Sequence, residues 1–178
     1  MDRLQSNNTW SAPLSPRIRN IHAMFGSLPF SGSLEEVQND FRLSFFITIN
    51  PKTSRWNGAA ATIAPAKGSS VWGTVWELGV EDIPSLDRQE GIYKALNVDV
   101  ISEDRSLTCR TYLLEPTTVP SDWDMRPSPQ YMDIIIKGAI QSKLPDEYID
   151  QLKNVEHNNY SGPMKKVVMN THEIFATE

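Results

Sequence analysis

Apolar and polar residues alternate along several stretches in the middle of the chain, a pattern typical of β-strands. The stretch 41–50 (FRLSFFITIN) is rich in aromatic and β-branched residues and is stopped by the Asn50-Pro51 pair. Further strands are predicted at 58–65 (GAAATIAP), 69–79 (SSVWGTVWELG), 96–102 (LNVDVIS) and 107–115 (LTCRTYLLE). The last two are separated by a short polar turn, which predicts a hairpin.

Four stretches have helical features instead. In 33–40 (SLEEVQND), Ser33 and Glu36 have the spacing of a capping box, which predicts a helical turn or two. A short helix is expected within 79–91, where Pro84 fits a first turn and Gly91 follows the end. Longer helices are predicted at 127–144 (PSPQYMDIIIKGAIQSKL) and 144–158 (LPDEYIDQLKNVEHN), the second with apolar residues at helical spacing.

The order of these elements predicts the fold class. Strands dominate the middle and helices come late, which favours an α+β fold over a doubly wound parallel sheet. Both faces of the strand at 69–79 are largely apolar, as expected for a strand covered on both sides. We therefore expect a small mixed β-barrel of about five to six strands with helices packed around it. Residues 1–20 are interpreted as a flexible leader, 21–162 as one domain and 163–178 as a peripheral tail.

Composition narrows the class of protein. The chain has 178 residues, 39% hydrophobic and 22% charged, which fits one compact globular domain. Its formal net charge of −5 argues against nucleic acid or an anionic membrane as the main partner. The sequence contains no uninterrupted apolar run long enough to span a membrane. Its polar start, interrupted by prolines, lacks the apolar core of a secretory signal. We therefore expect a cytoplasmic protein.

Cysteine and histidine are scarce. Cys109 is the single cysteine, so no internal disulfide can form, and a reducing compartment fits best. It lies in an alternating strand pattern, where a small buried apolar residue is the expected role. The three histidines lie in no recognisable motif, which argues against a catalytic thiol and against a zinc site.

Several polar and aromatic residues are candidates for chemistry. Glu90, in SLDRQEG, would suit proton transfer if it sat at an apolar barrel mouth, but spacing does not choose between it and the neighbouring carboxylates Asp87 and Glu81. Tyr131, at a helix start, either packs or offers its hydroxyl to a substrate. The glycine- and serine-rich stretch 25–33 (FGSLPFSGS) is either a plain loop or an anion cradle. Three tryptophans are read as core packing, with a ligand-stacking surface as the alternative: Trp56, Trp72 and Trp76.

Taken together, the segments of residues 41–162 resemble the gamma-glutamylcyclotransferase family. The residues that carry the resemblance are WNGAAATIAP, VWGTVWEL, SLDRQEG, LTCRTYLL, PSPQYMDIIIKGA and LPDEYIDQLKNVEHNNYSG, in the order of the family. The resemblance implies a small β-barrel surrounded by helices, in agreement with the strand pattern.

The resemblance also implies a reaction, in which a γ-glutamyl amino acid cyclises to 5-oxoproline and releases the free amino acid. It implies that Glu90, in Gln-Glu-Gly, is the catalytic acid/base and that Tyr131, in Pro-Ser-Pro-Gln-Tyr, contacts the substrate. No metal or organic cofactor is implied. The implied partner is therefore the small-molecule γ-glutamyl amino acid. The resemblance also suggests a homodimer, which the spacing of residues does not indicate.

Two departures from the family pattern lie next to the implied site. The family's Tyr-Gly-Ser-Asn-Leu loop, whose amides hold the glutamyl carboxylate, is absent. Its nearest counterpart is Phe25, Gly26, Ser27 and Leu28, with no asparagine. The connection after Gln-Glu-Gly is also shorter, since Gly91 runs almost directly into the next strand. An alternative is therefore a catalytically impaired member of the fold that acts as a binding or interaction protein.

Overall fold

The computed structural model describes residues 17–22, 33–38, 40–47, 54–102 and 105–163. The strands are β1 (Arg17–His22), β2 (Ser33–Gln38), β3 (Phe41–Phe46), β4 (Ala60–Pro65), β5 (Ser70–Gly79), β6 (Lys94–Ser102) and β7 (Arg105–Leu113). The helices are a 3₁₀ turn η1 (Val80–Asp82), α1 (Ile83–Gln89), α2 (Pro129–Gln141) and α3 (Asp146–Lys153). None of the described helices is long and apolar enough to cross a membrane.

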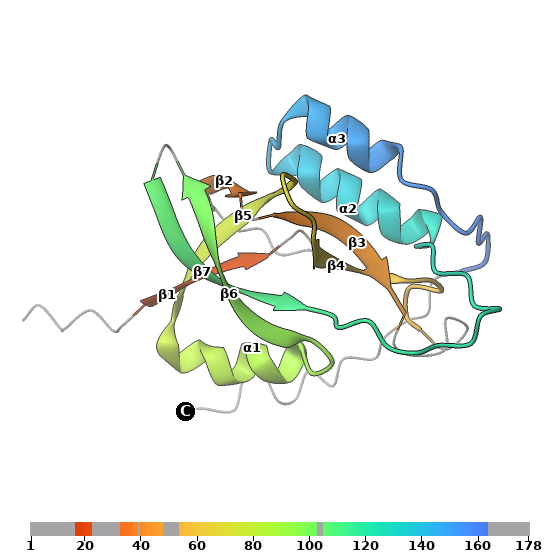
Figure 1. Ribbon diagram of the computed structural model, residues 1–178, viewed down its shortest axis with the longest axis horizontal. Helices are drawn as coiled ribbons and strands as arrows, with labels where there is room; N and C mark the ends of the chain where they lie inside the picture. The colour runs from red at the N-terminus through yellow and green to blue at the C-terminus, as the bar shows by residue number, and fades with distance from the viewer. Residues whose placement is uncertain (1–16, 23–32, 39, 48–53, 103–104, 164–178) are drawn as a thin grey trace, which may run out of the picture.

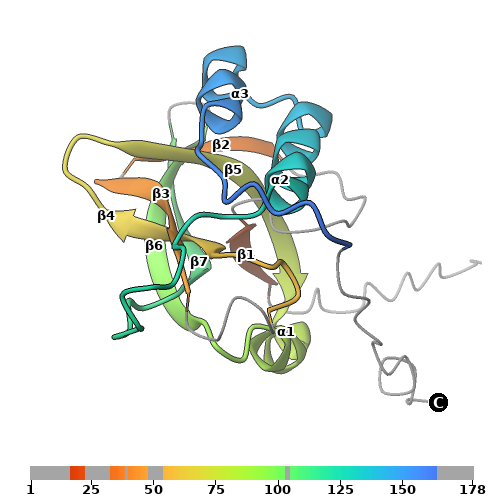
Figure 2. The ribbon, with the colours of Figure 1, turned by 90° about the vertical axis from the view of Figure 1, so that its right-hand side faces the viewer.

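Five of these strands pair in a closed barrel, in the order β1-β5-β2-β6-β7. The ring closes through a short parallel pairing of β1 with β7, while β3 and β4 form a separate antiparallel pair. Helices α2 and α3 lie side by side at one end, and α1 lies at the other (Figures 1 and 2). The α+β class and the small barrel with surrounding helices are thus as expected.

The strand predictions agree with the structure except at the N-terminal side. The segment 33–40 was expected to make a helical turn, but Ser33–Gln38 is strand β2, paired along its length with β5. The local capping-box spacing is outweighed by a ladder of backbone hydrogen bonds to a distant strand. Strand β1 begins at Arg17, inside the stretch expected to be a leader.

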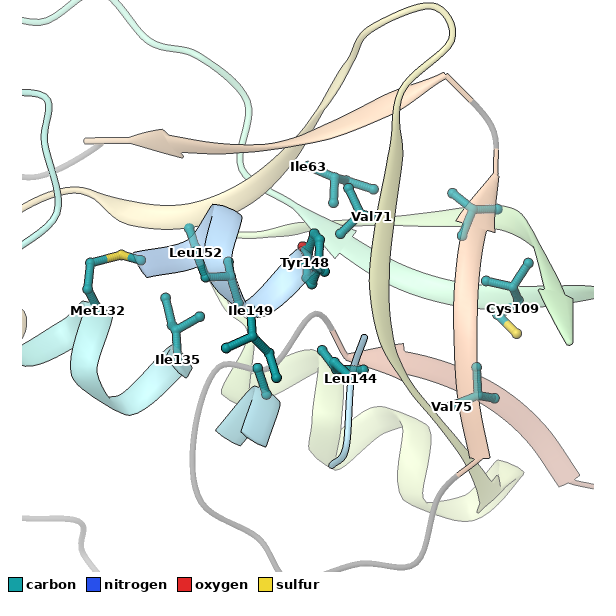
Figure 3. Packing of buried hydrophobic residues seen from close by; sticks show 14 of the residues in the cluster. Ile63, Val71, Val75, Cys109, Met132, Ile135, Leu144, Tyr148, Ile149 and Leu152 are labelled. Carbon is teal, nitrogen blue, oxygen red and sulfur yellow. The ribbon is translucent and has the colours of Figure 1, made fainter. Parts of the chain in front are cut away.

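The core lies between the barrel strands and helices α2 and α3. Figure 3 shows Met132 and Ile135 of α2 beside Ile149 and Leu152 of α3, with strand residues next to them. Cys109 is fully buried in this cluster, in the role expected for it. Ile140, within the helix predicted at 127–144, lies on the outer face of α2 and is 52% exposed.

Candidate functional site

Tyr131 lies in the first turn of α2, at a position set by the sequence before it. Ser128 is the N-cap, and its Oγ accepts a hydrogen bond from the Tyr131 N–H at 3.3 Å. Pro129 follows in the first turn, where its missing N–H costs nothing. This start directs the Tyr131 side chain inwards, and only 1% of the residue is exposed. The residue is therefore more deeply buried than expected of a tyrosine whose hydroxyl lies at a cleft rim.

The hydroxyl groups of two tyrosines meet the backbone of one residue in β4. The Ala61 N–H donates to the hydroxyl of Tyr131 at 3.1 Å, and the hydroxyl of Tyr93 donates to the Ala61 carbonyl at 3.4 Å. In an antiparallel pair the N–H and C=O of one residue point to the same side. Both groups of Ala61 therefore point away from β3, and the two tyrosines satisfy the edge of β4 that β3 leaves unpaired.

Glu90 ends helix α1 and begins the turn into β6. Its N–H donates to the Leu86 carbonyl at 3.0 Å, and its own carbonyl accepts from the Tyr93 N–H at 2.6 Å. The residue is half-buried. The tight turn thus places Tyr93 beside Glu90, within the short connection noted in the sequence.

The charge of Glu90 acts on both tyrosine hydroxyls. Burial raises the pKa of Tyr93 to about 12, and the Glu90 carboxylate adds to the rise. The pKa of Tyr131 is raised above its usual range by burial first, then by Tyr93, with a smaller contribution from Glu90. Tyr93 links Glu90 to Tyr131, which is far away in sequence, because its N–H donates to the Glu90 carbonyl and its hydroxyl meets that of Tyr131 at Ala61.

The neighbouring carboxylates are less suited to accept a proton. Asp87 accepts hydrogen bonds from the Tyr112 hydroxyl at 2.5 Å and from Arg110 Nη2 at 2.7 Å. The hydrogen bond from Tyr112, and then that from Arg110, lowers the pKa of Asp87. Glu81 lies in η1 and is exposed. Of the three carboxylates that the sequence left open, Glu90 is the one whose charge acts on both tyrosine hydroxyls.

The tryptophans support the packing interpretation. The ring of Trp56 stacks on that of Tyr131, with centroids 4.5 Å apart and planes at 29°. Trp72 also packs against the core, and Trp76 is partly buried. The loop that carries Trp56 lies close against the start of α2. A Cβ added to Gly58 would lie only 2.7 Å from the backbone nitrogen of Ser128, so a glycine is needed there. Trp56 therefore packs against one face of the Tyr131 ring and helps to fix it.

Tyr93 was missed as a site residue by the sequence reasoning. The available signal was an aromatic residue three positions after Glu90, at the start of an alternating strand. The stretch Phe25, Gly26, Ser27 and Leu28 lies outside the described residues. Among the described residues, no three His, Cys, Asp or Glu side chains gather in a group suited to a metal ion.

The raised pKa of Tyr93 predicts a specific alkaline sensitivity. Because the folded value is above the usual value near 10, the neutral phenol stabilises the fold below about pH 10, and this contribution is lost as pH rises toward about 12. Between about pH 9 and about pH 11, the free energy of unfolding of the wild type should fall by about 1 kcal/mol more than that of Tyr93→Phe. Urea titrations at both pH values measure this difference. Equal losses in the two proteins would contradict it.

Comparisons with known proteins find relatives of this chain in sequence and in structure. A family model described as the AIG2-like family matches residues 70–152. A Mus musculus gamma-glutamylcyclotransferase is 40% identical over 128 residues, which cover 69% of this chain and 65% of that protein. The Homo sapiens gamma-glutamylcyclotransferase is 37% identical over 134 residues, covering 72% of this chain and 69% of that protein. A solved gamma-glutamyl cyclotransferase structure superposes with a TM-score of 0.70 at 28% identity, over 85% of this chain and 95% of that one.

Proposed function

The chain belongs to the gamma-glutamylcyclotransferase family, and we propose that it converts a γ-glutamyl amino acid into 5-oxoproline and the free amino acid, with Glu90 as general acid/base. The observation that carries the assignment of Glu90 is its tight turn to Tyr93, whose hydroxyl meets that of Tyr131 at Ala61. The relatives support the reaction class, and the local geometry supports the choice of carboxylate.

The chemistry requires one group that first accepts and then donates a proton. At neutral pH the α-amine of the substrate is an ammonium, which cannot attack the γ-carbonyl. Glu90 takes one proton from it, the C–N bond of the ring forms, and the bond to the departing amino acid breaks. The ring nitrogen also gives up a second proton, so that the departing amino acid ends as an ammonium. The proton held by Glu90 is then given to the leaving amine. Because the attack is intramolecular, holding the glutamyl moiety folded supplies much of the acceleration.

In this proposal the substrate lies beside Tyr131, and the carboxylate of its glutamyl moiety is held by the backbone amides of Phe25, Gly26, Ser27 and Leu28. The burial of Tyr131 and its stacking on Trp56 support a fixed wall rather than an adaptable one. A cytoplasmic location and a homodimer belong to the same proposal. Light scattering of the purified protein tests the dimer.

The reaction is tested by incubating the full chain with γ-glutamyl-alanine and quantifying all products. We expect 5-oxoproline and alanine in equal amounts. The matched control is the same dipeptide acetylated on its α-amine, which cannot cyclise and should give no alanine. Release of glutamate in place of 5-oxoproline would show hydrolysis and contradict the proposed function.

The changed N-terminal loop supports a second candidate, a cyclotransferase fold that binds without turnover. The family asparagine is absent from Phe25, Gly26, Ser27 and Leu28, so fewer contacts to the glutamyl carboxylate are expected. This candidate predicts a calorimetric binding signal for γ-glutamyl-alanine with no 5-oxoproline formed. Turnover in the wild type excludes it.

A further inference from the structure

We infer that Asp87, Arg110 and Tyr112 form a clamp that holds helix α1 on strand β7 and thereby positions Glu90. The inference rests on the proposed function, because it assigns these three as positioning residues for that reaction. The Tyr112 hydroxyl and Arg110 Nη2 both donate to the same oxygen of Asp87, at 2.5 and 2.7 Å. Arg110 Nε also donates to the Tyr112 hydroxyl at 3.3 Å, so the three groups form a closed triangle.

The two donors are placed for this role by the strand. Residues two apart on a β-strand project from the same face, so Arg110 and Tyr112 reach toward α1 together. The guanidinium of Arg110 lies 5.4 Å from the centre of the Tyr112 ring, which keeps it over that ring. Tyr112 is buried, and the side chains of Arg110 and Asp87 are 24% and 44% exposed. We therefore expect the clamp to contribute more to holding α1 than an isolated surface ion pair would, since the contribution of such a pair to stability is usually small.

Among the described residues, helix α1 has few other contacts that fix its orientation. None of its seven residues, Ile83–Gln89, is buried, so the apolar packing that orients most helices is weak here. No side chain caps its N-terminus, since Asp82 makes no capping hydrogen bond. A short helix with these features depends on specific polar contacts to keep its orientation, and the contacts of Asp87 with β7 supply them.

The clamp acts on Glu90 through a short path. Asp87 and Glu90 are one helical turn apart, and Glu90 then closes the turn to Tyr93 through its carbonyl. Strand β6 begins directly afterwards, and its Ala95 lies opposite Tyr112 in the register with β7. The turn that carries Glu90 is therefore anchored to β7 on both sides, by the β6–β7 ladder and by the clamp. Among the described residues, losing the clamp leaves the β6–β7 ladder to anchor this turn to β7.

The test compares Asp87→Asn, Tyr112→Phe and the double variant in the full chain. We expect kcat for 5-oxoproline formation to fall about tenfold while KM changes less than about twofold, because displacing an acid/base impairs the chemical step more than binding. The double variant should lose little more than either single variant, as expected of groups that act as a unit. The matched control, Asp150→Asn, removes an exposed ion pair with Lys153 on α3 and should leave kcat unchanged.

A second measurement separates this inference from the proposed function. Amide hydrogen exchange at Glu90, whose N–H bonds to Leu86, should be about tenfold faster in both single variants, whether or not the protein turns over substrate. If the wild type is inactive, the proposed function fails, and unchanged exchange would overturn the clamp as well. If the wild type is active and Glu90→Gln is inactive, the proposed function stands. In that case the clamp alone is overturned if kcat is unchanged in the clamp variants, or if their KM rises by as large a factor as their kcat falls. If Asp87→Asn does not fold, Tyr112→Phe, which keeps the ion pair between Asp87 and Arg110, still tests the clamp.

Discussion

Replacing Glu90 by glutamine should lower kcat for 5-oxoproline formation by about 10³-fold, within the range that general acid–base catalysis contributes. Glutamine keeps the size and the backbone of the turn, but it neither accepts the proton of the substrate ammonium nor donates one to the leaving amine. KM should change little, since the substituted amide removes a group used in the transition state. Steady-state measurement of 5-oxoproline with γ-glutamyl-alanine gives both constants.

The control for this change is another glutamate close by in the chain. Glu81 is exposed in η1, and Glu81→Gln removes the same charge at the other end of α1. It should leave kcat within about twofold of the wild type, because surface charges act weakly through water. If Glu90→Gln keeps most of the wild-type kcat, or if Glu81→Gln loses as much, Glu90 is not the acid/base.

Much of the fold was predictable because its signals are local. The strands that became β3, β4 and β5 are rich in aromatic, β-branched or small apolar residues, and glycine or proline lies close to at least one end of each. The start of α2 follows from Ser128 and Pro129, whose side chains act within one turn. The prediction of a helical turn at 33–40 was wrong because Ser33–Gln38 pairs with β5, and a partner strand far away in sequence leaves no signal in a local pattern.

The site shows the same division. Glu90 and Tyr131 were singled out by the motifs around them; in the fold Tyr93 links the two, and their roles stay predictions. Tyr93 was not, because its role depends on the unpaired edge of β4 at Ala61, which only the assembled fold creates. The choice of Glu90 over Asp87 likewise needed the partners of Asp87 on β7, which lie more than twenty residues further along the chain.

Replacing Tyr131 by alanine should have the largest effect on stability, lowering the free energy of unfolding by about 4 kcal/mol, as for other large aromatic residues removed from a core. The side chain is 1% exposed, stacks on Trp56 and accepts the hydrogen bond of the Ala61 N–H. Removing it opens a cavity and leaves that N–H buried without its acceptor. Urea unfolding followed by tryptophan fluorescence measures the loss.

Tyr131→Phe separates the two contributions, because it keeps the ring and removes only the hydroxyl. It should cost about 1–3 kcal/mol, the penalty of a buried donor left unsatisfied. Tyr160→Phe is the matched control, since the Tyr160 hydroxyl donates to the Pro163 carbonyl at an exposed position and its loss should cost less than about 0.5 kcal/mol. Equal costs in the two variants would mean that the Ala61 bond adds nothing. A larger cost for Tyr131→Phe, together with lower kcat/KM in the protein that remains folded, assigns one hydroxyl to both the fold and the substrate.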